Sequence, residues 1–168
     1  MTKSSSQTPN AWKMGNTCYG TGLALELAKK MLEAAEKEAK KQNVPMVIAI
    51  SDAGGNLLAF HRMDNAILMS IQIAMDKAFT AVFGKQHTWQ WSGPFREGRL
   101  IPLFMHERWI TFPGGLPLIK DGTLVGGLGV SGGTIEDLYV AKAALKAGDF
   151  STEEVDGAIA KSEAGMKP

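Results

Sequence analysis

The chain has 168 residues, a length that suits one domain with a hydrophobic core of its own. Lys and Arg number 18 against 17 Asp and Glu, so no excess of positive charge is available for binding a nucleic-acid backbone. Apolar residues make up 45% and charged residues 21% of the sequence. These proportions exclude a wholly disordered chain and predict an ordinary globular domain.

The first ten residues are polar and lack the apolar stretch of a secretory signal, so we expect a cytoplasmic protein. No run approaches the roughly 18 apolar residues that a membrane helix needs, and we expect no membrane contact. The single cysteine, Cys18, excludes an internal disulfide, and we interpret it as a small packing residue. We expect residues 1–15 to form a flexible lead before a single domain over residues 16–168.

The sequence of the first half of the domain predicts a helix, a hairpin and a second helix. Apolar side chains recur at helical spacing over residues 22–42, with charged pairs on the other side. Two short β-prone runs follow at residues 46–51 and 56–62, and the Asp52-Ala53-Gly54-Gly55 segment between them is typical of a hairpin turn. The second helix is expected over residues 64–83.

The second half begins with residues 85–108, which show no clean period and contain several Trp, Phe and Pro residues. Such a segment indicates a functional region or short helices. Residues 116–120 and 123–130 are predicted strands, because Asp121-Gly122 between them favours a type I′ turn. A helix and a shorter last helix follow. Since hairpins pair antiparallel strands, the sequence predicts an α+β fold with a central antiparallel sheet flanked by helices.

Three helix starts are predicted from capping residues. Asp64 or Asn65 is expected to cap the second helix, and Thr134 the helix after the last strand. The Ser151-Thr152-Glu153-Glu154 segment is typical of a capping box before the last helix.

The glycine-rich segment at residues 127–133 matches two motifs whose structural context is absent. Its GxGxxG spacing lacks the following strand and acidic residue of a dinucleotide-binding unit. Its GxSxG spacing centres on Ser131, but all three histidines precede that serine, which excludes an α/β-hydrolase. Ser131 as a nucleophile on another fold stays open. Gly127 and Gly129 inside the strand would let a ligand or another backbone approach closely.

Two glycine turns are candidate sites for an anion. Ser131-Gly132-Gly133-Thr134 precedes a predicted helix, where unpaired amides and the helix dipole favour a carboxylate or phosphate. Pro113-Gly114-Gly115 precedes a predicted strand and offers further amides. The alternative in both cases is a plain turn without a ligand.

Three charged side chains are candidate binding or catalytic groups. Arg62 could hold a carboxylate by two hydrogen bonds. Lys77 lies among small residues, where a ligand carboxylate could reach it or burial could lower its pKa; the alternative is a surface lysine. Asp64 could act as a general base or serve only as a helix cap. The histidines lack zinc-ligand spacing, so no metal site is predicted.

Taken together, the motifs resemble the GlcG/HbpS family, which includes the C-terminal domain of PduO-type proteins. They are, in chain order, Gly54-Gly55-Asn56-Leu57, Arg62-Met63-Asp64, Lys77-Ala78-Phe79-Thr80, Pro113-Gly114-Gly115-Leu116-Pro117 and GGLGVSGG over residues 126–133. The resemblance spans about residues 23–147. It implies a profilin-like fold, homo-oligomers, and haem binding or haem degradation, with other members in corrinoid, diol and aromatic catabolism.

The resemblance also implies one polar ligand pocket. Its lining residues would be Arg62, Asp64, Lys77, Gly114, Gly115, Ser131, Gly132 and Gly133. His61 and His106 are the candidate axial ligands if haem binds, because a single histidine needs no motif spacing. The sequence departs from the pattern of the resembled family at two places. Asn65 occupies a position where the family usually has glycine. The acidic segment after Gly133 is one residue shorter than in the family, which puts a role for the acidic residue there in doubt.

Three functions agree with these residues. The first is a small-molecule binding protein, with haem or a related flat ligand against Trp and Phe side chains and its carboxylates on Arg62, Lys77 and the turn at residues 131–134. The second is an enzyme of small-molecule catabolism that acts on a small carboxylate with Lys77 and Asp64 as acid and base. The third is an accessory homo-oligomer without activity. The residues leave open whether the protein is an enzyme.

Overall fold

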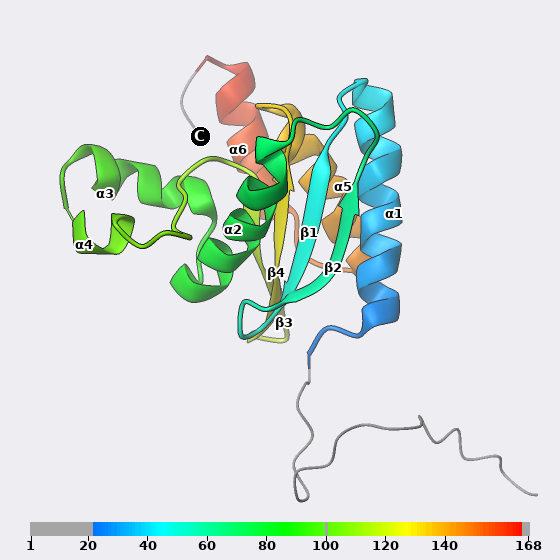
Figure 1. Ribbon diagram of the computed structural model, residues 1–168, viewed down its shortest axis with the longest axis horizontal. Coiled ribbons are helices and arrows are strands. Elements are labelled where there is room, and N and C mark those ends of the chain that lie inside the picture. Colours follow the sequence, from blue (N-terminus) through cyan, green and yellow to red (C-terminus); the bar gives the residue numbers. More distant parts are fainter. Residues whose placement is uncertain (1–21, 100, 166–168) are drawn as a thin grey trace, which may run out of the picture.

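The structure is a computed structural model that describes residues 22–99 and 101–165. The predicted flexible lead and Cys18 lie outside these residues. The centre of the fold is an antiparallel sheet of four strands in the order β2-β1-β4-β3 (Figure 1). The strands are β1 (Val47–Asp52), β2 (Leu57–Arg62), β3 (Gly115–Lys120) and β4 (Thr123–Ser131). The predicted α+β class with a central antiparallel sheet is confirmed.

Both predicted hairpins form, and their turns explain why. In the first, the Asp52 carboxylate accepts hydrogen bonds from the backbone N–H of Gly54 at 2.8 Å and of Asn56 at 2.9 Å. In the second, Asp121 and Gly122 have φ values of 50° and 74°, as a type I′ turn requires. The paired strands β1–β2 and β3–β4 follow directly from these turns.

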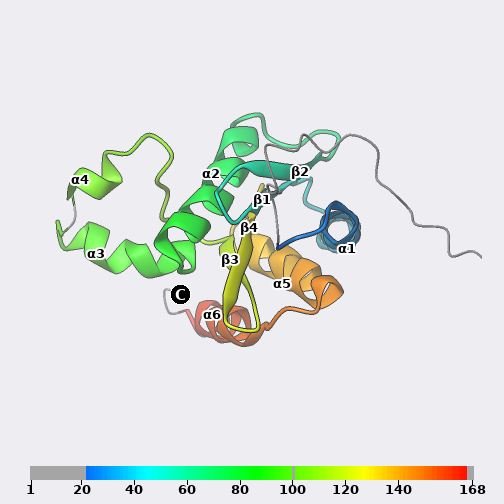
Figure 2. The ribbon, with the colours of Figure 1, turned by 90° about the horizontal axis from the view of Figure 1, so that it is seen from below.

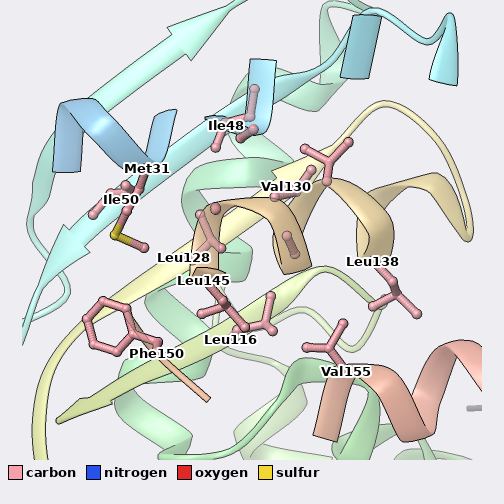
Figure 3. Close-up of a cluster of buried hydrophobic side chains, with 14 of the residues drawn as sticks. Met31, Ile48, Ile50, Leu116, Leu128, Val130, Leu138, Leu145, Phe150 and Val155 are labelled. Atoms are coloured by element: carbon pink, nitrogen blue, oxygen red, sulfur yellow. The ribbon is translucent and has the colours of Figure 1, made fainter. Parts of the chain in front are cut away.

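Helices cover the two faces of the sheet unequally. Figure 2 shows α2 (Met69–Gly84) on one side and α1 (Leu25–Gln42), α5 (Glu136–Gly148) and α6 (Glu153–Glu163) on the other. The larger core fills the space beneath α1 and α5 (Figure 3). Its buried side chains include Met31, Ile48, Ile50, Leu116, Leu128, Val130, Leu138, Leu145, Phe150 and Val155.

On the other face, α2 packs unusually close to the sheet, because β4 carries glycines there. A Cβ atom on Gly129 would clash with the carbonyl oxygen of Ala74, and one on Gly127 would clash with that of Ala78. The close approach that these glycines predicted is therefore made by the backbone of α2.

The predicted caps of α2 and α5 are wrong, and the predicted capping box of α6 is not formed. α2 begins at Met69, with Leu68 in the cap position, because Asn65 adopts a left-handed φ of 65° and turns the chain before the helix. α5 begins at Glu136, and the Thr134 hydroxyl bonds to the Glu136 carboxylate. α6 begins at Glu153, within the predicted segment, but the capping box does not form. The Ser151 hydroxyl accepts only from the N–H of Glu153, at 3.4 Å, and the hydroxyl of Thr152, in the cap position, donates to the carboxylate of Asp156.

Residues 85–99 and 101–112, here called the arm, project from the body beside α2 (Figures 1 and 2). As the sequence suggested, the arm contains short helices, namely η1 (Thr88–Trp91), α3 (Ser92–Arg96) and α4 (Ile101–Phe104). It is tied to α2 by the Thr80 hydroxyl, which donates to Arg108 O and accepts from Ile110 N, each at 3.1 Å. None of the helices in the described chain has the length and apolar character to cross a membrane.

Candidate functional site

A cavity of about 470 Å³ lies between the first turns of α2 and the turn that follows β4; we call it the α2 pocket. Its walls are mostly apolar, and charged groups lie at one end. The lining residues are Ile67, Met69, Ser70, Ile73, Lys77, Phe112, Pro113, Ser131, Gly132, Gly133, Thr134, Ile135, Asp137, Leu138 and Ser162. They come from α2, the end of the arm, the glycine turn, α5 and α6.

Lys77 is buried in the wall of this pocket, so the alternative of a surface lysine is wrong. Only 2% of the residue is exposed. Its Nζ donates to the Asp137 carboxylate and to the backbone oxygen of Val130, both at 2.7 Å. Burial lowers the pKa of Lys77, and the attraction of Asp137 opposes that shift. Burial likewise raises the pKa of Asp137, against the opposing effect of Lys77.

The glycine turn does form beside a helix start, but the helix supplies its own anions. The N–H of Gly133 donates to Asp137 Oδ1 at 2.8 Å, and the N–H of Thr134 donates to Glu136 Oε2 at 2.9 Å. Both carboxylates lie in the first turn of α5, where the helix dipole favours negative charge. The expected unpaired amides of Gly133 and Thr134 are therefore occupied, and a ligand carboxylate would have to displace Asp137 or Glu136.

In the Pro113-Gly114-Gly115 turn, Gly114 packs closely against Lys77 and the amide of Gly115 is already bonded. Gly114 has a φ of 109°, and a Cβ there would lie 3.0 Å from Lys77 Nζ. The N–H of Gly115 donates to the Thr88 hydroxyl at 3.1 Å, which anchors β3 to the arm. The expectation that the Gly115 amide faces a ligand is thus corrected, while Gly114 lies directly beside the lysine.

Ser131 and Gly132 complete the wall at the end of β4. Ser131 is buried, and its hydroxyl donates to the hydroxyl of Ser70 at 3.1 Å. Gly132 has a φ of 150°, and a Cβ there would press on the backbone of Pro45 and Met46. The structure therefore brings Lys77, Ser131, Gly132 and Gly133 together around one cavity, with Gly114 packed against Lys77.

Arg62 and Asp64 lie elsewhere, which corrects the expectation of a single pocket. They line a separate surface hollow with Glu36, Lys40, His61 and Met63, which we call the β2 hollow. The strand register explains the separation. Val47 pairs with Arg62 on one side and with Ser131 on the other, so Arg62 and Ser131 are two strands, or about 10 Å, apart. The predicted acid–base pair of Lys77 and Asp64 is not assembled; Asp137 is the carboxylate beside Lys77.

The two candidate axial histidines differ in how their rings are held. His61 Nδ1 lies 3.1 Å from the Glu36 carboxylate, a bond that keeps the proton on Nδ1 and leaves Nε2 able to bind a metal. His106 Nδ1 instead accepts from the backbone N–H of Arg108 at 3.2 Å, so its proton lies on Nε2. His61 lines the β2 hollow, and His106, in the arm, stacks on Phe79 of α2. Neither lines the α2 pocket in the described part of the chain.

Sequence reasoning missed the group that organises the pocket, Asp137. Two features could have indicated it. Lys77 lies among Ala74, Ala78 and Ala81, so its side of the helix was a candidate for burial, and a buried lysine needs a partner. Asp137 follows the glycine turn by four residues, at the first turn of α5, where a carboxylate satisfies free amides. Ser70, which bonds to Ser131, has no comparable signal in the sequence.

Comparisons with known proteins agree with this architecture. Residues 23–146 match the family model described as "Haem degrading protein HbpS-like". An "uncharacterized 15.0 kDa protein in dhaT-dhaS intergenic region" of Citrobacter freundii is 40% identical over 127 residues, 73% of this chain and 89% of that protein. Protein GlcG of Escherichia coli strain K12 is 37% identical over 110 residues, 65% of this chain and 81% of GlcG. The crystal structure of a PduOC:heme complex matches with a TM-score of 0.71 and 34% identity, covering 76% of this chain and 95% of that one.

Proposed function

Because the chain belongs to the HbpS-like family of haem-degrading proteins, we propose that it binds haem, or a related flat carboxylate-bearing molecule, in the α2 pocket. The observation that carries the proposal is the apolar cavity between α2 and the glycine turn. Its volume of about 470 Å³ lies within the range of small-molecule sites, roughly 300–1,000 Å³. The haem complex formed by the PduOC relative, whose chain is 34% identical, supports the same class of ligand.

The residues of the pocket fit the apolar part of a macrocycle. Ile67, Met69 and Phe112 are 52%, 66% and 61% exposed although they are large apolar side chains. All three lie at the rim of the α2 pocket. A flat ligand that covers them would remove this apolar surface from water, which stabilises the complex.

The charges of the pocket determine where the ligand carboxylates would lie. Among the described lining residues, Lys77 is the one lysine or arginine, and its ammonium is already paired with Asp137. Glu136 and Asp137 already occupy the amides of Thr134 and Gly133. The carboxylates of a bound ligand are therefore expected at the open rim, in contact with water.

The iron of a bound haem would need a ligand from the same surface. Met69 carries a thioether at the rim, and Met is a known axial ligand of haem iron. His61 is held suitably by Glu36 but lies in the β2 hollow. We therefore propose Met69 as the iron ligand in the α2 pocket. His61 is the alternative iron ligand, and substituting it tests whether haem binds in the β2 hollow instead. Bound haem would supply redox and oxygen chemistry.

Hemin titration of the purified protein, followed by its Soret absorbance, tests the site. Met69→Glu and Ile67→Glu should each weaken binding by at least about tenfold, because a carboxylate would then face an apolar ligand. Leu57→Glu is the matched control, since Leu57 is 54% exposed on β2 and outside the pocket. Equal affinity in all three variants would contradict the proposal. Loss of binding in His61→Ala, with Met69→Glu unaffected, would assign the ligand to the β2 hollow instead.

A further inference from the structure

Lys77 presents a primary amine at the end of an apolar cavity, a position that stability alone does not explain. The ion pair with Asp137 is fully desolvated, with 3% of each side chain exposed. Replacing such a pair by apolar residues of similar size is often neutral or stabilising. The pair therefore suggests a chemical use for the amine.

We propose that Lys77 condenses with small neutral aldehydes or ketones that enter the α2 pocket, and forms a Schiff base with them. Lysines desolvated in apolar pockets are suited to this reaction, because the neutral amine is the nucleophile. The proposal concerns an activity separate from haem binding, although both use the same cavity.

Gly114 closes one side of the amine. A Cβ at this position would lie 3.0 Å from Lys77 Nζ and 2.5 Å from the carbonyl oxygen of Val130, so no further carbon atom fits there. Lys77 lines the pocket, so a carbonyl compound would reach the nitrogen from the cavity side.

The hydrogen bonds of the amine leave one of its protons without a partner. An ammonium has three N–H donors, and Lys77 gives two of them to Asp137 and Val130. Among the described residues, no third acceptor bonds to Lys77 Nζ. The side of the nitrogen without a partner can therefore meet a carbonyl carbon.

Asp137 can carry the proton that the reaction moves. Burial lowers the pKa of Lys77 and raises that of Asp137, so transfer of a proton from Nζ to Oδ2 along their 2.7 Å bond costs less than in water. The neutral amine adds to the carbonyl carbon, and the carbonyl oxygen takes a proton from the nitrogen to give a carbinolamine. Asp137 then protonates the departing hydroxyl, water leaves, and a C=N bond forms.

The charges balance over the whole sequence. One ammonium and one neutral carbonyl compound give one protonated imine and one water, and Asp137 returns to its carboxylate form. The protonated imine is then paired with Asp137 as the ammonium was. No oxidant, reductant or metal is needed.

The electrostatics of the pocket select neutral carbonyl compounds over 2-oxo acids. A substrate carboxylate would find the glycine-turn amides bonded to Asp137 and Glu136, and these two carboxylates would repel it. The apolar side chains of Ile73 and Leu138 instead suit a short alkyl group. Propionaldehyde is therefore the probe of choice.

The test is reductive trapping of the imine. The protein is incubated with propionaldehyde and sodium cyanoborohydride in mildly acidic buffer, and peptide mass mapping then locates propylated lysines. Exposed lysines have a pKa of about 10.4 and are almost wholly protonated there, so Lys77 should be labelled at least about tenfold faster than Lys85 or Lys120. Labelling of Lys77 no faster than of these two surface lysines would overturn the proposal.

Two variants separate entry through the pocket from general reactivity. Ile67→Trp narrows the rim and should slow labelling of Lys77 while leaving Lys85 unchanged; Leu57→Trp is its matched control. No effect of Ile67→Trp would mean that the aldehyde does not enter there, which contradicts the proposal.

Lys77→Arg keeps the positive charge and removes the reactive amine, so the fast adduct should vanish while circular dichroism shows a folded chain. Hemin titration of the same samples reports haem binding separately.

Discussion

Asp137 joins Lys77 to the glycine turn through its two carboxylate oxygens. Oδ2 accepts from Lys77 Nζ, sixty positions earlier in the chain, and Oδ1 accepts from the N–H of Gly133. Lys77 also holds Val130 O, so helix α2, the end of β4 and the start of α5 meet at one ion pair. The shape of the α2 pocket depends on this connection.

Removing one partner of the pair should destabilise the fold strongly. In Asp137→Ala the Lys77 ammonium stays buried without its counterion, and we expect a loss of about 3–5 kcal/mol in the free energy of unfolding. Urea denaturation measures this change. The double variant Lys77→Met with Asp137→Leu should recover most of the loss, because neither charge then remains. As a control, Glu26→Ala removes an exposed pair with Lys29 and should change stability by less than about 1 kcal/mol. A small loss in Asp137→Ala would show that the pair is not buried as described.

His87 should make the protein less stable in acid. Burial lowers the pKa of His87 from 6.5 to about 4, so the unfolded chain binds a proton at a higher pH than the folded chain does. The stabilisation is complete above the unfolded value and is lost as the pH falls from about 6.5 to about 4. At pH of about 5 the expected loss is roughly 2 kcal/mol relative to neutral pH.

Urea denaturation at the two pH values, for wild type and His87→Gln, isolates this effect. The variant should show a shallower fall in stability, because its side chain at position 87 cannot be protonated. His106→Gln, on the exposed part of the arm, keeps His87 and should retain the wild-type fall. If the stability of His87→Gln falls with pH as steeply as that of the wild type, the acid sensitivity belongs to another group.

The contact between α2 and β4 should tolerate no added methyl group. Gly129→Ala would place a Cβ against the carbonyl oxygen of Ala74, and we expect a loss of about 1–3 kcal/mol or more as the helix is forced off the sheet. Thermal unfolding measures the change. Gly157→Ala is the control, since nothing lies within 4 Å of the Cβ position in helix α6. It should stabilise the protein by roughly 0.5–1 kcal/mol, the usual gain for Ala over Gly inside a helix. Equal stability of the two variants would contradict the close packing.

The arm should take part in self-association. Ile101 and Met105 are 57% and 79% exposed on its outer part, and large apolar side chains so placed favour contact with another protein surface. The expected homo-oligomer is therefore predicted to use this region. Ile101→Glu with Met105→Glu should shift the protein to smaller species in sedimentation velocity, and Leu25→Glu, 46% exposed on α1, is the control. An unchanged sedimentation coefficient in the arm variant would exclude the arm from the contact.

The sequence was sufficient for features that depend on local chemistry. Asp121-Gly122 determines a turn by its backbone preferences, and Gly129 inside a strand indicates a close approach. Asn65 belongs to the same class: it occupies a usual glycine position of the resembled family, and its φ of 65° shows why a residue tolerant of left-handed backbone is needed there.

Features that depend on distant contacts were not predictable in the same way. Lys77 is buried against Asp137 and Val130, both far along the chain. Arg62 was grouped with Ser131 because both belong to family motifs, but the strand order places β1 between them. The Thr134 hydroxyl was expected to cap a helix and instead donates to the neighbouring Glu136 carboxylate. Whether a hydroxyl accepts from a helix N–H or donates to a nearby carboxylate is settled only by the folded geometry.

Thr88 closes the neck of the arm, because its hydroxyl donates to the backbone oxygen of Phe112 at 2.5 Å and accepts from Gly115 N. The chain thus leaves the body and returns to it at almost the same point. Excursions closed in this manner accept insertions and deletions at low cost to the rest of a domain. The arm is therefore the part of this fold where a change of length should cost least, and Phe112 is the arm residue through which such a change would reach the α2 pocket.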